Sequence, residues 1–245
     1  MNGKIRAFVD WVGSHEQYVL LAMACIVGGT WIFIALADKV QDGDTHAIDR
    51  AVLTAMRRPL DPNRPVGPDN PSVPLGPRWV QESARDITAL GGYPVLTLLT
   101  LAVVGFLALD RKFGAMWFVL GATVGGSVLT LGLKTLIDRP RPDVVEHLTY
   151  VATSSFPSGH STMSAVVFLT LGSLLTRLLP HRWLRFYVLA VAILLTLLVG
   201  FTRIYLGVHY PSDVLAGWTA GLVWATLCWL VARAMQRRGR IESQV

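Results

Sequence analysis

Basic residues stand at the ends of long apolar segments, where their side chains suit the binding and transfer of a phosphate group. Lys134 ends one such segment and is followed by Arg141, and Arg203 ends a later one. Arginine side chains match phosphate oxygens with two parallel hydrogen bonds, so phosphate suits this set better than a single carboxylate does. The three cations by themselves predict a binding site for a multiply charged anion.

The stretch Pro157-Ser158-Gly159-His160 opens another apolar segment and offers a second means of binding an anion. Ser158 is a natural N-cap, and Gly159 lets an anion approach the backbone. The first turn of a helix presents unpaired N–H groups and the positive end of the helix dipole. This stretch therefore predicts a phosphate group at the N-terminus of a helix.

The histidines His160 and His209, each at the opening of an apolar segment, predict catalysis and not binding alone. Asp213 stands four residues after His209. If Pro211 lies in the first helical turn, Asp213 folds back towards Nδ1 of His209 and leaves Nε2 free as a nucleophile. In hydrolytic triads a carboxylate orients a histidine in the same way, but here the histidine itself would be the attacking group.

Membrane spans are the elements that must position these residues. The chain has 245 residues, of which 52% are hydrophobic and 16% charged. A soluble domain carries roughly 25% charged residues, so a disordered chain and an ordinary soluble domain are excluded. Crossing a bilayer takes about 20 apolar residues. The sequence predicts an all-α polytopic membrane protein, with a bundle of six transmembrane helices at residues 18–37, 91–109, 113–133, 161–179, 186–206 and 214–232.

A long loop, residues 38–90, joins the first two spans and contains most of the prolines. Prolines recur at every third position from Pro62 to Pro77, a spacing that suits polyproline II and excludes a helix. Residues 47–56 and 79–89, on either side, suit short helices at the membrane interface. Two interpretations of the loop stay open, a solvated connector and a lid that controls access of the substrate. The whole chain, 1–245, is treated as one domain, with residues 134–213 as its catalytic motif region.

The topology places all the residues singled out above on one side of the membrane. Total lysine and arginine counts on the two sides are equal, but basic residues cluster at short loops and at the C-terminus. That clustering favours cytoplasmic N- and C-termini in the plasma (inner) membrane, with the site periplasmic. The 22 basic residues do not form one basic face, so no nucleic-acid partner is expected despite the net charge of +6. The oligomeric state stays open.

Three motifs in order along the chain resemble the signature of the type 2 phosphatidic acid phosphatase superfamily. They are Lys134-x6-Arg141-Pro142, Pro157-Ser158-Gly159-His160 and Arg203-x5-His209-x3-Asp213. The superfamily comprises integral membrane lipid phosphatases and soluble relatives, including vanadium haloperoxidases and bacterial acid phosphatases. At one position the family usually has serine, and this chain has Thr202. Its hydroxyl is expected to keep a polar contact to phosphate.

The resemblance implies a role for each residue of the motifs. His209 attacks phosphorus and forms a phosphohistidine, while Asp213 orients its ring. His160 protonates the leaving oxygen and then activates water. The residues that hold the phosphate oxygens are Lys134, Arg141, Ser158, Gly159 and Arg203. No metal ion and no other cofactor is expected, since the cations and the helix end take the role that magnesium has in other phosphoryl-transfer sites.

A membrane-level site with this resemblance implies hydrolysis of a phosphate or pyrophosphate from a lipid of the bilayer. Undecaprenyl diphosphate is the first expectation, and phosphatidylglycerophosphate and phosphatidate are alternatives. A lipid phosphotransferase stays open, because a phosphohistidine can pass its phosphoryl group to an acceptor other than water. Two remoter alternatives are a vanadate haloperoxidase, against which six spans argue, and a non-catalytic lipid-binding protein, which would be expected to lack one of the motif residues.

Arg139 has two interpretations, a residue of the site and a structural partner of Asp138 or Asp143. The four histidines without motif partners are expected at the surface; they are His15, His46, His147 and His181.

Overall fold

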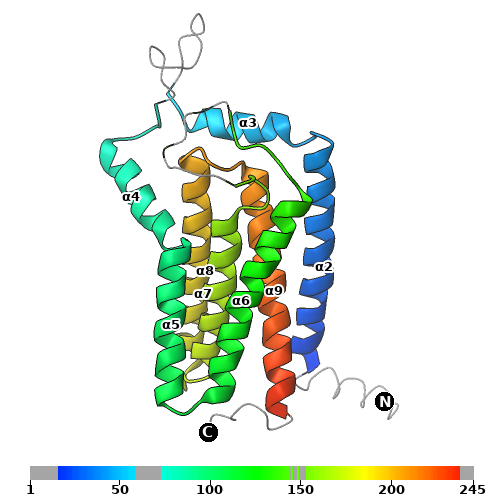
Figure 1. Cartoon of the computed structure of the whole chain (residues 1–245), viewed down its shortest axis with the longest axis vertical. Coiled ribbons are helices and arrows are strands. Elements are labelled where there is room, and N and C mark those ends of the chain that lie inside the picture. The colour runs from blue at the N-terminus through cyan, green and yellow to red at the C-terminus, as the bar shows by residue number, and fades with distance from the viewer. Residues whose placement is uncertain (1–15, 59–72, 144, 146–147, 149–152, 238–245) are drawn as a thin grey trace, which may run out of the picture.

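The computed structural model describes residues 16–58, 73–143, 145, 148 and 153–237, and the elements in these residues are helices (Figure 1). The predicted all-α fold class is therefore confirmed. The helices are α2 (Glu16–Gln41), α3 (His46–Ala55), α4 (Arg78–Ala89), α5 (Tyr93–Leu109), α6 (Phe113–Leu136), α7 (Gly159–Thr176), α8 (Arg182–Tyr205) and α9 (Pro211–Arg237).

Five helices, α2, α6, α7, α8 and α9, are each long and apolar enough to cross a membrane. The sixth span is a pair, α4 and α5, whose axes differ by 46°. The break has a local cause, since Pro94 lies in the first turn of α5 and lacks the N–H group that a continuous helix would need. The described residues thus contain five candidate spans, or the predicted six when the bent pair is counted as the second span.

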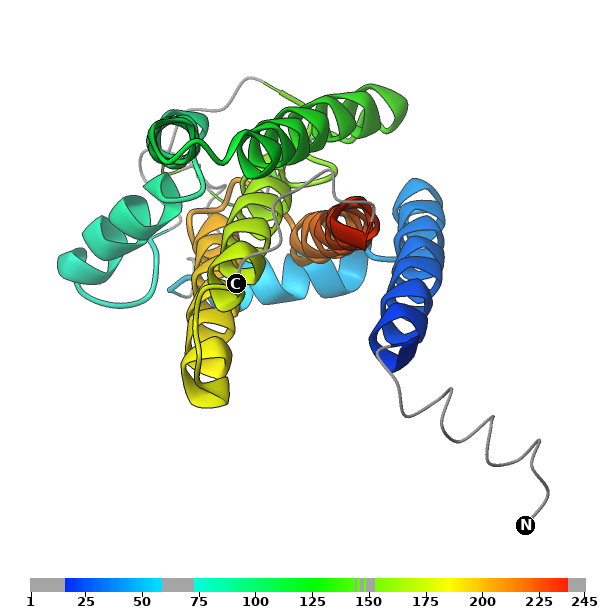
Figure 2. The ribbon, with the colours of Figure 1, turned by 90° about the horizontal axis from the view of Figure 1, so that it is seen from below.

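Helix α7 lies at the centre of the bundle and contacts α5, α6, α8 and α9. In its most apolar stretch 56% of the residues are buried, against 6% in α2, which lies at the edge beside α9 (Figure 2). Apolar side chains such as Trp31 and Leu98 face outwards. Outward apolar side chains are expected where the surrounding medium is hydrocarbon.

Two glycines of α9, one helical turn apart, allow its backbone to lie directly against α7. A Cβ atom at Gly217 would be 2.7 Å from the carbonyl oxygen of Ser158, and one at Gly221 would be 2.6 Å from that of Thr162. Small residues at this spacing permit close helix contact in membranes. The first turns of α7 and α9 are therefore brought together at the upper end of the bundle in Figure 1.

Helix α3 lies across this upper end, where α6 and α8 finish and α7 and α9 begin (Figure 1). Its Leu53 is fully buried in a cluster with Ile204, Tyr210 and Val214. The helices expected at residues 47–56 and 79–89 correspond to α3 and α4. Most of the proline-rich stretch between them, from Pro62 to Pro71, lies outside the described residues.

Candidate active site

The first turn of α7 has the cap that the sequence predicts. The backbone N–H of Ser161 donates to Oγ of Ser158 at 3.4 Å, and the N–H of Ser158 donates to the carbonyl oxygen of Asp213 at 3.0 Å. A Cβ atom at Gly159 would be 3.5 Å from Cε of Lys134. The lysine side chain therefore lies along the helix N-terminus, where both favour an anion.

Lys134 and Arg141 are held in place by neutral carbonyl groups. Nζ of Lys134 donates to the carbonyl oxygen of Ser154 at 2.6 Å. Arg141 donates from Nε to the carbonyl oxygen of Thr153 at 2.8 Å and from Nη1 to that of Val208 at 2.7 Å. These bonds orient the two side chains without cancelling their positive charges, which stay available to an anion.

Arg203 is almost completely buried, with 2% of its surface exposed, so it does not reach for the membrane surface. Its Nη1 donates to Oγ1 of Thr88 at 3.2 Å, and its Nε has no hydrogen-bond partner in the part of the chain that the structure describes. His160 lies next to Gly92, and the charges of Lys134, Arg141 and Arg203 act on its ring. The cations of the first and third motifs thus converge around the imidazole of the second.

His209 is buried with its two ring nitrogens in opposite electrostatic surroundings. Nδ1 is 3.5 Å from Oδ2 of Asp213 and 3.5 Å from Oγ of Ser155, whereas Nε2 is 3.2 Å from Nη1 of Arg141. Pro211 is the first residue of α9, the arrangement in which Asp213 was expected to fold back. Burial lowers the pKa of His209 to about 3, against the opposing effect of Asp213. The ring is therefore neutral at pH 7 and keeps a lone pair.

The carboxylate of Asp213 is completely buried and accepts hydrogen bonds at both oxygens. Oδ1 accepts from Nη1 of Arg139 at 2.6 Å, and Oδ2 accepts from the backbone N–H of Tyr210 at 2.9 Å. The hydroxyl of Ser155 also donates to Oδ2. These donors fix the orientation of the carboxylate and favour its charged form.

Arg139 forms ion pairs with Asp213 and Asp49. Of the two interpretations that the sequence left open, the geometry favours a residue of the site over a structural partner of Asp138 or Asp143. Nη2 of Arg139 donates to Oδ2 of Asp49 at 2.8 Å, and its guanidinium lies 4.2 Å from the ring centroid of Tyr210. Burial acts to lower the pKa of Arg139, but the charge of Asp213 and the hydrogen bonds to both carboxylates outweigh it and raise the pKa. Arg139 supports the acid of the site, since both its charged partners are carboxylates.

Asp49 is a buried residue of the site that the sequence reasoning missed. Its Oδ1 accepts the backbone N–H of Ser212 at 3.0 Å, and its Oδ2 accepts the hydroxyl of Ser212 at 2.5 Å. The side chain of Asp49 in α3 therefore caps the first turn of α9, whereas a helix is usually capped by the residue directly before it. Ser155 and Thr88 were also missed, and no local pattern marks any of the three, because their partners are remote in sequence.

The hydroxyl of Thr202 donates to the carbonyl oxygen of Val199 at 2.7 Å, within α8. Adjacent residues project from a helix about 100° apart, so Thr202 and Arg203 point in different directions. The polar contact of Thr202 to phosphate stays a prediction.

All eight residues predicted for the site lie at the upper end of the bundle, brought there by the ends of α6 to α9. Among the unpartnered histidines, His46 and His181 are exposed, as predicted. His15 and His147 lie outside the described residues.

Comparisons with known proteins agree with this architecture. The model of the PAP2 superfamily matches residues 114–237. Phosphatidylglycerophosphatase B of Bacillus subtilis is 34% identical over 78% of this chain and 86% of its own length. Decaprenylphosphoryl-5-phosphoribose phosphatase of Mycobacterium tuberculosis is 32% identical over 57% of this chain and 73% of its own.

Two solved structures are similar to the whole bundle or to most of it. The crystal structure of a transmembrane PAP2 type phosphatidylglycerolphosphate phosphatase from Bacillus subtilis matches with a TM-score of 0.74 and 26% identity, over 88% of this chain and 97% of that one. LpxE of Aquifex aeolicus matches with a TM-score of 0.51 and 27% identity, over 64% of this chain and 88% of that one. Fold and relatives together define a multi-pass membrane lipid phosphatase. The chain belongs to the PAP2 superfamily.

Proposed function

We propose that this enzyme hydrolyses a lipid phosphate or pyrophosphate through a phosphohistidine at His209, without a metal ion. One observation carries the proposal. The neutral ring of His209 has a buried carboxylate on its Nδ1 side and the guanidinium of Arg141 on its Nε2 side. A carboxylate there holds the proton on Nδ1, so the lone pair belongs to Nε2 and faces the cations that would bind phosphate.

In the first step Nε2 of His209 attacks phosphorus and forms an N–P bond. The bond from phosphorus to the leaving oxygen breaks, and that oxygen takes a proton from His160. The products are the dephosphorylated lipid, or the lipid monophosphate from a pyrophosphate, and the phosphohistidine. Asp213 stabilises the positive charge that the ring acquires during the attack.

In the second step water attacks the phosphohistidine. His160, now neutral, accepts a proton from the water, an oxygen–phosphorus bond forms, and the N–P bond breaks. Inorganic phosphate leaves and His209 is restored. Throughout, the charge on the equatorial oxygens is balanced by Lys134, Arg141 and Arg203 and by the N–H groups that follow Ser158 and Gly159.

The proposed location is the outer surface of a plasma (inner) membrane, with both ends of the chain in the cytoplasm. The beginning of α2 and the end of α9 lie at the lower end of the bundle in Figure 1, opposite the site. The clustering of basic residues at short loops supports a cytoplasmic lower end. A protease or thiol-labelling assay on sealed cells tests this orientation.

Two substrates are supported. Undecaprenyl diphosphate is the expectation from the sequence, and a putative undecaprenyl-diphosphatase of Escherichia coli is 31% identical over 43% of this chain. Phosphatidylglycerophosphate is supported equally, since the Bacillus subtilis relative with 34% identity is named for it. Phosphatidate is a further alternative.

A phosphate-release panel tests both the reaction and the substrate. Purified protein in detergent is given each lipid phosphate with EDTA present, next to His209→Ala. We expect phosphate release from at least one lipid and its loss in the variant. Metal-dependent release that survives the substitution would overturn the mechanism. Adding a competing alcohol distinguishes a phosphotransferase, which would form a new phosphate ester.

A further inference from the structure

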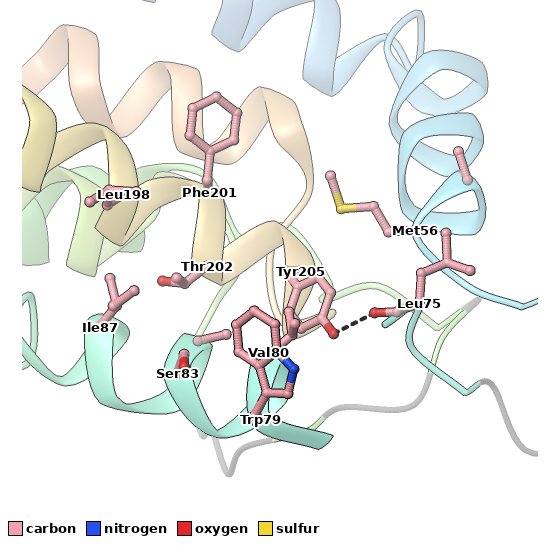
Figure 3. Close-up of a pocket in the computed structure, with 12 residues that line it drawn as sticks. Met56, Leu75, Trp79, Val80, Ser83, Ile87, Leu198, Phe201, Thr202 and Tyr205 are labelled. Carbon is pink, nitrogen blue, oxygen red and sulfur yellow. Dashed lines mark hydrogen bonds between the residues drawn. The ribbon is translucent and has the colours of Figure 1, made fainter. Parts of the chain in front are cut away.

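An apolar cavity of about 400 Å³ lies between α4 and α8, below the end of α3 (Figure 3). It is lined by large apolar side chains of α4 and α8, among them Val80, Ile87, Leu198 and Phe201, and by Met56, which follows α3. None of the described lining residues carries a charge. A cavity of this size can hold part of a small ligand, and its walls favour an apolar one.

Two of the hydroxyl groups in the cavity wall are already satisfied by the protein itself. The hydroxyl of Tyr205 donates to the carbonyl oxygen of Leu75 at 2.7 Å, as Figure 3 shows, and that of Thr202 donates to Val199. A polar occupant would lose hydrogen bonds to water and gain few in return. The wall, whose remaining residues are mostly apolar, therefore favours hydrocarbon over a polar headgroup.

Helix α4 presents different faces to the cavity and to its surroundings. The half-buried Val80 and Ile87 and the exposed Trp79 line the cavity, whereas the charged Glu82 and Asp86 are exposed and do not line it. Tryptophan and tyrosine side chains such as Trp79 and Tyr205 are typical of the level where headgroups meet the acyl chains. The cavity is thus placed at the depth of the upper part of a lipid's hydrocarbon chain.

The cavity adjoins the cluster of cations. Thr202 and Ile87 in its wall are the chain neighbours of Arg203 and Thr88, which are joined by a hydrogen bond of 3.2 Å. The bend between α4 and α5 contains Gly92, which lies beside the ring of His160. One helix pair therefore borders both the proposed phosphate site and the cavity.

We infer that this cavity binds the hydrocarbon chain of the substrate lipid next to its phosphate, and that α4 thereby sets a preference for long-chain substrates. The inference rests on the proposed function, because the hydrocarbon chain in the cavity and the phosphate in the active site must belong to the same lipid molecule. Its occupant is the substrate itself and not a structural lipid of the bilayer.

Filling the cavity tests the inference. Ser83→Trp places an indole among the lining residues of α4, and each protein is assayed with dioleoyl and dibutyryl phosphatidate, which share one headgroup. We expect kcat/KM for the dioleoyl lipid to fall about tenfold or more, the range expected when a pocket loses apolar contact. For the dibutyryl compound it should stay within about twofold, because short chains gain little from the cavity.

Gly121→Trp is the matched control. Gly121 lines another apolar cavity, between α6 and α9 near their lower ends, and a Cβ atom there would meet nothing within 4 Å. This variant should keep the chain-length preference of the wild type. Equal losses on both substrates in Ser83→Trp, or none, would overturn the inference. If the wild type hydrolyses neither phosphatidate, the same comparison of long and short chains is made with phosphatidylglycerophosphate. A wild-type enzyme that releases phosphate from no lipid of the panel would instead overturn the proposed function.

Photolabelling gives a readout that needs neither turnover nor a variant of the cavity. His209→Ala protein is irradiated with a phosphatidate that carries a diazirine in its acyl chain. We expect label on α4 and on the last two turns of α8, with competition by dioleoyl phosphatidate and little by phosphatidylcholine. Equal competition by phosphatidylcholine would identify a general bilayer lipid, and label confined to other helices would exclude the cavity. Either result would overturn the inference.

Discussion

Asp49 and Asp213 bind the same guanidinium group, that of Arg139, at distances of 2.8 and 2.6 Å. Asp213 belongs to the proposed catalytic pair with His209, and Asp49 belongs to α3, which lies across the site. All three charged groups are buried. The short helix in the loop is thus connected to the acid of the site through one arginine.

Asp49→Asn should lower kcat by about 10- to 100-fold, because small displacements of reacting groups carry penalties of that order. Asparagine keeps the shape but removes the charge that helps to hold Arg139 and the first turn of α9. KM should change by less than about threefold, since no phosphate-binding residue contacts Asp49. Steady-state kinetics on a hydrolysed lipid measure both.

Asp42→Asn is the control for this variant, because Asp42 is exposed in the turn after α2. Its kcat and KM should equal those of the wild type. A rise in KM at constant kcat in Asp49→Asn would contradict a positioning role and indicate a contact with substrate.

Gly217→Ala should reduce activity by about 100-fold and lower the apparent Tm, because the new Cβ forces the first turns of α7 and α9 apart. The nearest atoms, at 2.7 and 2.9 Å, are the Ser158 carbonyl oxygen and Ser161 Cβ, which have little freedom to move. In Gly132→Ala the added Cβ would meet nothing within 4 Å. That control should stay active, and a fully active Gly217→Ala would refute the close-contact explanation.

Thr88→Val should reduce kcat/KM by about five- to tenfold, the cost of one hydrogen bond of ordinary strength. The change removes the acceptor that holds Nη1 of Arg203. Thr100→Val is the matched control, because the buried hydroxyl of Thr100 has no hydrogen-bond partner among the described residues. A similar loss in both variants would show that the effect is one of packing.

The buried ring of His209 predicts a pH dependence of stability. Its pKa falls from 6.5 to about 3 on folding, so below pH 6.5 the unfolded chain binds a proton that the folded chain does not. The contribution of this group to stability should therefore decrease as the pH falls from 6.5 towards 3. Apparent Tm at pH 6.5 and 5.5, compared between wild type and His209→Gln, isolates the contribution. An equal change in apparent Tm between the two pH values in both proteins would exclude a contribution from His209.

Much of the site could be predicted from sequence because its residues are anchored to helix ends. Ser158 precedes α7, Pro211 begins α9, and Lys134 and Arg203 lie in the last turns of α6 and α8. Helix ends can be recognised from prolines, caps and the loss of apolar character. Once the number of spans is known, the ends of α6 and α8 and the beginnings of α7 and α9 must lie on the same side of the membrane.

The partners of Arg139 could not be predicted in this way. Asp138 and Asp143 are near it in sequence, but the carboxylates that it contacts come from α3 and α9. The direction of the Thr202 hydroxyl was likewise decided by the helix, which offers an acceptor in its own backbone. Short-range patterns contain no information on either choice.

The sequence by itself determined that the chain lies in a bilayer, where its spans are and in which order the motifs follow. Hydrocarbon surroundings require long apolar helices, and binding of phosphate requires cations, which stand at the ends of these helices. Only the tertiary structure decided which charges are paired with each other and which are held by neutral carbonyls. It also decided where the apolar cavity lies, between α4 and α8. These features depend on backbones in contact, such as Gly217 against Ser158, and close packing joins residues that are remote in the chain.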